Sequence, residues 1–114
     1  MIESVTQAAL SSALDGLSLR QNVISNNIAN VNTPNYHAQR VEFESALAQS
    51  VANGNGNVTA TIATSEEPTQ LNGNNVNLDT ETVSNIDTVL QYQFATQAMS
   101  DQFKGIETAL GANP

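Results

Sequence analysis

Few side chains in this sequence have the type and spacing that catalysis or metal binding requires. His37 is the single histidine and cysteine is absent, so a zinc site or a nucleophile–histidine pair has no partners close by in the sequence. Glu66 with Glu67, or Asp79 with Glu81, could act as paired carboxylates, but nothing around them indicates a pocket. We interpret the first pair as part of a solvated loop and the second as the acidic first turn of a helix.

An asparagine–glycine segment imitates a calcium-binding loop without completing it. Asn53, Asn55 and Asn57 alternate as loop ligands do, but Val58 stands where such a loop needs Gly, and Thr64 where it needs the bidentate Glu. The sequence also lacks a glycine-rich phosphate loop followed by Lys. We therefore expect no metal, no cofactor and no small-molecule substrate, and we predict that the protein is not an enzyme.

Charge and hydropathy limit the classes of partner. Three basic residues against eleven acidic ones give a formal net charge of −8, which disfavours nucleic acid and anionic lipid surfaces. No apolar run approaches the ~20 residues that span a bilayer, so we expect no membrane-spanning segment. The first residues lack a basic start followed by an apolar stretch, which predicts that any export proceeds without a cleaved signal peptide.

The composition predicts a marginal core. The 114 residues suffice for one domain, but only 12% are charged and 4% aromatic, while 39% are hydrophobic. Such a chain has apolar surface to bury and few residues with which to build a dense core of its own. We expect it to complete its fold against copies of itself or against partners.

We predict a long amphipathic helix over roughly residues 3–31. Its apolar residues recur at steps of four and three, the period of a coiled-coil seam, with Gln21 at the one missing place. The members of this N-terminal stripe are Leu10, Leu14, Leu17, Ile24, Ile28 and Val31. Gly16 costs about 1 kcal/mol relative to Ala inside a helix. Thr33 precedes Pro34, so the helix should end near residue 32.

A second long helix is predicted over roughly residues 79–110, with Gly111 as its stop signal. It has two apolar runs joined by a phase shift near Ala95. The members of this C-terminal stripe are Val83, Ile86, Leu90 and Phe94, then Met99, Phe103, Ile106 and Leu110. We expect the helices to run antiparallel, with the N-terminal stripe facing the first of these runs. The residues of both stripes are the candidate assembly interface.

The middle of the chain is rich in turns, with a short strand expected near residues 41–43 and a helical turn or two within 45–51. Residues 58–62 could form another strand if they find a partner. We therefore predict a mainly α fold, with two long terminal helices forming a coiled-coil-like hairpin. One domain would contain an N-terminal axial helix (1–32), a turn and loop-rich middle segment with a little β structure (33–77) and a C-terminal axial helix (78–114).

One segment resembles the SNNIANxxTPGY signature of the bacterial flagellar axial proteins, which form the rod, hook and hook-associated structures. The matching residues are Ser25, Asn26, Asn27, Ile28, Ala29, Asn30, Thr33, Pro34 and Tyr36. Asn35 stands where the family has Gly, and because both residue types accept left-handed backbone angles, we expect the turn to be kept. Residues 72–81 and 90–93 are similar to the C-terminal part of the proximal rod subunits in this family. Residues 49–71 match nothing that we can place.

The resemblance implies a structural subunit of the proximal rod of the flagellar basal body, in the periplasmic space. Such a subunit would join the MS ring to the rod and transmit torque. Its partners would be itself, other rod subunits, the MS ring with its adaptor protein, and the flagellar type III export apparatus. The alternatives are another proximal rod subunit, or a soluble coiled-coil adaptor or export-chaperone-like binding module. An enzyme is the least favoured interpretation, and a well-formed polar pocket would revive it.

Overall fold

The computed structural model describes the backbone from Ile2 to Gly111 and the side chains from Val5 to Gly111. It is mainly helical, with two long terminal helices, as predicted. The elements are α1 (Ile2–Ala29), β1 (Gln39–Glu42), α2 (Glu44–Ala52), β2 (Thr61–Thr64) and α3 (Leu78–Gly111). Among the described residues, no helix combines the length and the apolar character that a membrane crossing requires.

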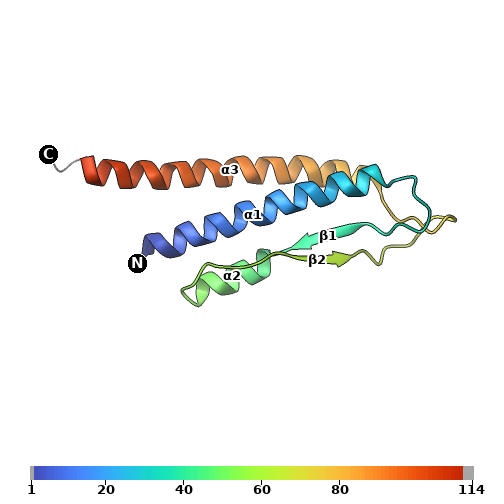
Figure 1. Cartoon of the computed structure of the whole chain (residues 1–114), viewed down its shortest axis with the longest axis horizontal. Coiled ribbons are helices and arrows are strands. Elements are labelled where there is room, and N and C mark those ends of the chain that lie inside the picture. The colour runs from blue at the N-terminus through green and yellow to red at the C-terminus, as the bar shows by residue number, and fades with distance from the viewer. Residues whose placement is uncertain (1, 112–114) are drawn as a thin grey trace.

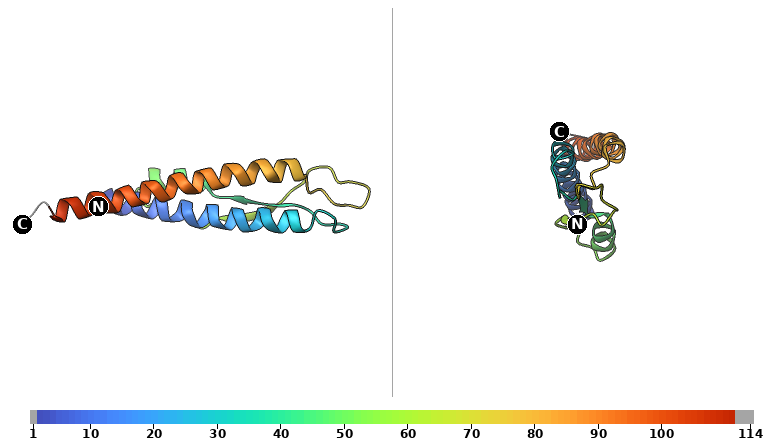
Figure 2. Two further views of the ribbon diagram at one scale, coloured as in Figure 1. Left: turned by 90° about the horizontal axis from the view of Figure 1, so that it is seen from above. Right: turned by 90° about the vertical axis from the view of Figure 1, so that its right-hand side faces the viewer.

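The molecule is elongated, with extents of 68 × 25 × 14 Å. Helices α1 and α3 run antiparallel along its length, and both chain ends lie at the same end of the molecule (Figure 1). The β1–β2 pair and α2 cover a different side of α1 (Figures 1 and 2). Helix α1 is therefore the central element, with α3 on one side and the middle segment on another.

The two strands form a small antiparallel sheet, in which Val41 pairs with Ile62. Strand β1 includes part of the predicted strand near residues 41–43 and begins two residues earlier. Strand β2 shares residues 61 and 62 with the predicted stretch at 58–62, but it begins three residues later and ends two residues later. Of this pair, the Val41 side chain is buried and the Ile62 side chain is half exposed. The core therefore covers β1 at this position and leaves β2 open to solvent.

The apolar core lies between α1 and the middle segment. Its buried members are Leu17, Val23, Val41 and Phe43. The Phe43 ring lies directly against Gly16, where an added Cβ would come within 2.6 Å of a ring carbon. Gly16 lowers the helix propensity of α1, but because it has no side chain, the Phe43 ring can pack directly on the helix backbone.

The predicted facing of the two stripes is wrong. The first run of the C-terminal stripe is exposed, with exposed fractions of 66% at Val83, 57% at Ile86, 53% at Leu90 and 79% at Phe94. The buried residues of α3 are Glu81 and Thr88. The physical reason is that β1 and α2 already cover much of the apolar surface of α1. What remains for α3 is a contact face of small and polar side chains.

Candidate functional site

The residues that could have done chemistry are scattered. His37, Glu66, Glu67 and Asp79 are exposed. Glu81 lies in the first turn of α3, as predicted, but it is only 8% exposed, which the sequence did not predict. Within the part of the chain that the structure describes, no three His, Cys, Asp or Glu side chains cluster closely enough to hold a metal ion.

Asn27, from the family-like signature, is completely buried and bonds three separate segments. Its amide nitrogen donates to the Gln39 carbonyl at 2.8 Å and to Glu81 Oε1 at 3.1 Å. Its amide oxygen accepts from the Gln39 N–H at 2.9 Å and from the Tyr36 hydroxyl at 3.2 Å. All four of its hydrogen-bonding positions are used. This one side chain therefore joins α1, the start of β1 and the first turn of α3.

Asn74 is also completely buried and holds the exit of α1. Its amide nitrogen donates to the carbonyls of Asn30 and Thr33, at 2.9 and 2.8 Å. Its amide oxygen accepts from the Val76 N–H at 2.8 Å. Both carbonyls lie just after the end of α1, so a residue more than forty positions along the chain holds the turn that follows the helix.

Asn75 performs the same task for the middle segment. Its amide oxygen accepts from the Ala38 N–H at 2.7 Å. Its amide nitrogen donates to the carbonyls of Ser65 and Glu67, both at 3.1 Å. We call Asn27, Asn74 and Asn75 the asparagine junction, because together they fasten the two helices and the hairpin at one end of the molecule.

The two turns that flank the asparagine junction touch each other. Asn35 has φ 61°, so the expectation that it keeps the left-handed turn is confirmed. Its N–H donates to the Asn72 carbonyl at 2.9 Å. Gly73 has φ +83°, and a Cβ there would lie 2.3 Å from the Asn35 side-chain oxygen. Two segments that the sequence motifs singled out separately thus form one structure.

The signature residues divide between inward and outward positions. Asn27 is buried, and Tyr36, Asn30 and Ile28 are half-buried. The other five are exposed: Ser25, Asn26, Ala29, Thr33 and Pro34. Asn27 is a member of the asparagine junction, and Tyr36 and Asn30 hydrogen-bond to it.

Burial sets the electrostatics of the asparagine junction. It raises the pKa of the Glu81 carboxyl, and the hydrogen bond from Asn27 partly opposes this effect. Burial also raises the pKa of the Tyr36 hydroxyl, as does the negative charge of Glu81. At each described buried side-chain nitrogen or oxygen, a hydrogen-bond partner is present. The site is thus a satisfied structural network, the kind that specifies a unique arrangement.

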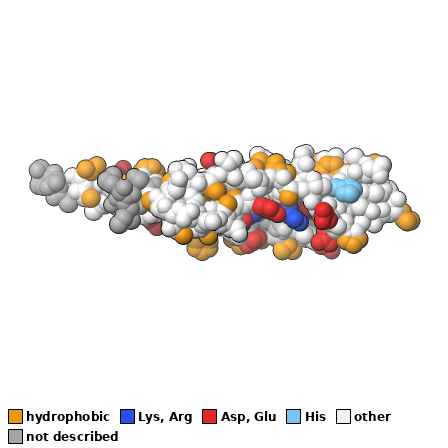
Figure 3. All heavy atoms as spheres, turned by 90° about the horizontal axis from the view of Figure 1, so that it is seen from below, with side chains coloured by type: hydrophobic (Ala, Val, Ile, Leu, Met, Phe, Trp, Pro, Cys, Tyr) orange, Lys and Arg blue, Asp and Glu red, His pale blue; other side chains and the backbone are white. Residues whose placement is uncertain are grey.

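Arg20 fastens the middle segment to α1. Its guanidinium donates to both oxygens of Glu44, at 2.6 and 2.7 Å, and to the Val41 carbonyl at 2.7 Å. It also lies 4.9 Å from the centre of the Phe43 ring. The bond to Glu44 raises the pKa of Arg20 and, in return, lowers that of Glu44. On the face of the molecule seen from below, acidic side chains border a small basic patch (Figure 3).

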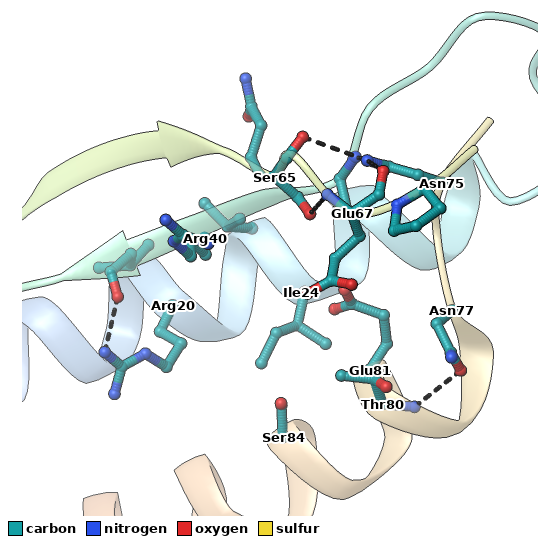
Figure 4. Close-up of a pocket in the computed structure, with 15 residues that line it drawn as sticks. Arg20, Ile24, Arg40, Ser65, Glu67, Asn75, Asn77, Thr80, Glu81 and Ser84 are labelled. Carbon is teal, nitrogen blue, oxygen red and sulfur yellow. Dashed lines mark hydrogen bonds between the residues drawn. The ribbon is translucent and has the colours of Figure 1, made fainter. Parts of the chain in front are cut away.

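A groove of about 570 Å³ lies between α1, β1 and the first turns of α3. In Figure 4, Arg20 and Ile24 reach it from α1, and Glu81 and Ser84 from α3. Among its lining residues there is no histidine, and the Ser65 hydroxyl accepts the Glu67 N–H instead of facing a base. The described lining of this groove therefore holds no serine hydroxyl paired with a histidine base.

The structure also locates the remaining stripe residues. Leu17 and Ile24 are buried, while Leu10, Leu14, Ile28 and Val31 are half-buried. Farther along α3, Met99 and Ile106 are half-buried, and Phe103 and Leu110 are exposed. Sequence reasoning missed the inner face of α3, where Glu81, Thr88 and Ala95 recur every seven residues. That repeat was a usable signal, but its members are polar or small.

Comparisons with known proteins point to one family. Residues 8–37 match a family model described as flagella basal body rod protein. The chain is 31% identical to the flagellar basal body rod protein FlgB of Bacillus subtilis, with 89% of each chain covered. It is 32% identical to the protein of that name from Borreliella burgdorferi, covering 85% of this chain and 89% of the relative. The Escherichia coli protein is 32% identical, covering 86% and 87%.

Proposed function

Because this chain belongs to the family of the flagellar basal body rod protein FlgB, we propose that it is a structural subunit of the bacterial flagellar rod. The observation that carries this proposal is the exposed run Val83, Ile86, Leu90 and Phe94 on α3. A contiguous apolar face left in water marks an interaction surface. Packing against neighbouring subunits would bury it.

The finer parts of the proposal concern place and partners. We propose that the subunit lies in the periplasmic rod, joins the MS ring and its adaptor protein to the other rod subunits, and transmits torque. It would leave the cell through the flagellar type III export apparatus without a cleaved signal peptide. The elongated shape supports this role, since long helices can pack side by side along a rod. No catalytic step is part of the proposal.

Two alternatives lead to different expectations. Another proximal rod subunit, similar to FlgC, would have different neighbours in the rod; the FlgB name of the matched relatives favours the first assignment. A soluble adaptor or export-chaperone-like module would stay in the cytoplasm as a small closed oligomer. A map of the intact basal body that locates this chain would separate all three.

The direct test is Leu90→Asp in the motile source bacterium. Because Leu90 is 53% exposed, the free chain should keep its fold, which circular dichroism checks. We expect isolated basal bodies to lack the rod and cells to lack filaments, although the protein is still made. Thr96→Asp is the matched control, because Thr96 is exposed on the same helix but lies off the apolar run. Normal rods in the Leu90→Asp cells would contradict the proposal.

A further inference from the structure

The chain contains three asparagine–glycine steps, at residues 53–54, 55–56 and 72–73. Asparagine is a thermolabile residue in proteins. It is least protected before glycine, because a residue without a side chain leaves its own backbone nitrogen free to approach the asparagine side chain. That nitrogen can attack the carbon of the side-chain amide. The three steps share this local chemistry, so the fold decides which of them can react.

The step at residues 55–56 is packed against α1. Gly56 is buried, and a Cβ there would lie 2.6 Å from the Val5 carbonyl oxygen. The Gly56 N–H donates to the Ser50 hydroxyl at 3.0 Å. The Asn55 side-chain oxygen accepts from the Asn57 N–H at 3.1 Å. Neither residue of this step can rotate toward the other without breaking these contacts.

The step at residues 72–73 is enclosed by the turn that follows α1. A Cβ on Gly73 would clash with the side-chain oxygen of Asn35, and the Asn72 carbonyl accepts from the Asn35 N–H at 2.9 Å. The Asn72 side-chain oxygen accepts from the Asn74 N–H at 3.1 Å. Because ring closure requires the asparagine to rotate, each of these contacts opposes the reaction.

The step at residues 53–54 is open. Asn53 and Gly54 are both exposed. Apart from the chain neighbours, no described atom lies within 4 Å of a Cβ built on Gly54. The Gly54 N–H donates to the Val51 carbonyl at 2.9 Å, and this bond must open before the nitrogen can react. It lies at the exposed end of α2, where hydrogen bonds open most readily.

We propose that Asn53 is a site of spontaneous deamidation. The Gly54 nitrogen forms a bond to Asn53 Cγ and gives up its proton, the Cγ–Nδ2 bond breaks, and ammonia leaves, which closes a succinimide ring. Water then opens the ring at either of its carbonyl groups and leaves aspartate or isoaspartate. The reaction needs only water, so it does not depend on the proposed function.

The product should affect the end of α2. Asn53 directly follows this helix, and its N–H donates to the Gln49 carbonyl at 3.0 Å. The helix dipole opposes a carboxylate at this end, and the last turn of α2 contains no basic residue. Deamidation should therefore loosen the last turn of α2, residues 49–52.

The test follows the full chain in mildly alkaline buffer, by peptide mapping with mass spectrometry and by isoaspartyl methyltransferase labelling. In the folded chain, Asn53 should react at least about fivefold faster than Asn55 or Asn72. In concentrated guanidinium chloride, where the fold no longer distinguishes the steps, all three should react within about twofold of one another. Asn53→Gln should abolish the fast reaction, because its longer side chain cannot close the same ring. Asn55→Gln should leave the fast reaction unchanged.

Asn53→Asp tests the effect on α2. Hydrogen exchange at residues 49–52 should be about two- to fivefold faster than in the wild type, whereas Thr96→Asp, on the exposed surface of α3, should leave it unchanged. An unmodified Asn53 in the folded chain, or equal rates at the three steps there, would overturn the inference. Unchanged exchange in Asn53→Asp would overturn the proposed effect on α2.

Discussion

At the scale of single residues, the asparagine junction determines how one end of this molecule is held. Asn27 uses all four hydrogen-bonding positions of its amide, on partners from three segments. Unsatisfied buried polar groups are expensive, whereas a complete network rigidifies the fold. Removal of the Asn27 side chain should therefore leave hydrogen-bonding groups of Gln39, Glu81 and Tyr36 without a partner.

The first prediction concerns Asn27→Ala. It leaves the buried Glu81 carboxylate and the backbone of Gln39 without their partner, so we expect it to lower the free energy of unfolding by about 2–4 kcal/mol. Asn26→Ala is the control, since that exposed side chain should change stability by less than about 0.5 kcal/mol. Urea unfolding measures both. Equal effects of the two substitutions would contradict the assigned role of Asn27.

The second prediction concerns Glu81 and pH. Because burial raises its pKa above the ordinary 4.5, the folded chain holds this proton more tightly than the unfolded chain. That contribution is fully present below the ordinary pKa and is lost as pH rises through the folded one. Glu81→Gln removes the buried charge and keeps an oxygen for Asn27. We expect the variant to be more stable than the wild type at neutral pH and to match it near about pH 3.5. Denaturation curves that show the same difference at both pH values would contradict this.

At the scale of elements, the first half of α3 turns its apolar run, Val83, Ile86, Leu90 and Phe94, away from its own chain. Its inner contact consists of residues such as Glu81, Thr88 and Ala95, seven positions apart, and its outer face carries Leu90 and Phe94. A helix normally turns its apolar stripe to the core. Here the core of α1 is occupied by the middle segment, through the contact of Gly16 with Phe43.

The third prediction tests that contact with two glycines. Helix propensity alone says that Gly→Ala stabilises a helix by up to about 1 kcal/mol. At Gly16 the new methyl group would meet the Phe43 ring at 2.6 Å, so we expect Gly16→Ala to destabilise the protein by about 1–3 kcal/mol. Gly105 has nothing within 4 Å of an added Cβ, and Gly105→Ala should stabilise the protein. Thermal unfolding gives both signs. A stabilising Gly16→Ala would show that Phe43 does not pack there.

At the scale of the whole molecule, the fold is a long, thin body held most firmly at one end. The asparagine junction fastens the region where α1 ends and α3 begins, and the Arg20 contacts fasten the middle segment to α1. Toward the chain ends, Phe103 and Leu110 of α3 are exposed, and α3 extends beyond the start of α1 (Figure 1). Stability should therefore fall along the length of the molecule.

The fourth prediction follows this gradient. In the free monomer, we expect amide protons of residues 100–111 to exchange rapidly and those of residues 78–90 more slowly, because only the latter adjoin the asparagine junction. Residues 100–111 should gain protection when the subunit assembles. Hydrogen exchange followed by mass spectrometry measures both states. Slow exchange at 100–111 in a monomer confirmed by sedimentation would contradict it.

Local patterns in the sequence were enough to predict both long helices, the strand near Val41 and the left-handed turn at Asn35. Each of these depends on a few neighbouring residues: apolar spacing, a residue before proline, or a side chain that accepts positive φ. The family-like segments were also visible, because they are contiguous.

Only the tertiary structure decided which face of α3 is covered, why Gly16 is a glycine, and that Glu81 is buried. An apolar stripe predicts that one face of a helix will be buried, but it does not predict which segment will cover that face. Both α3 and the middle segment pack on α1. The apolar part of the α1 surface is covered by the middle segment, through Val41 and Phe43. The interior of the asparagine junction was hidden for the same reason. Asn27, Asn74 and Glu81 look like surface residues until contacts between distant segments satisfy their hydrogen bonds and remove them from water.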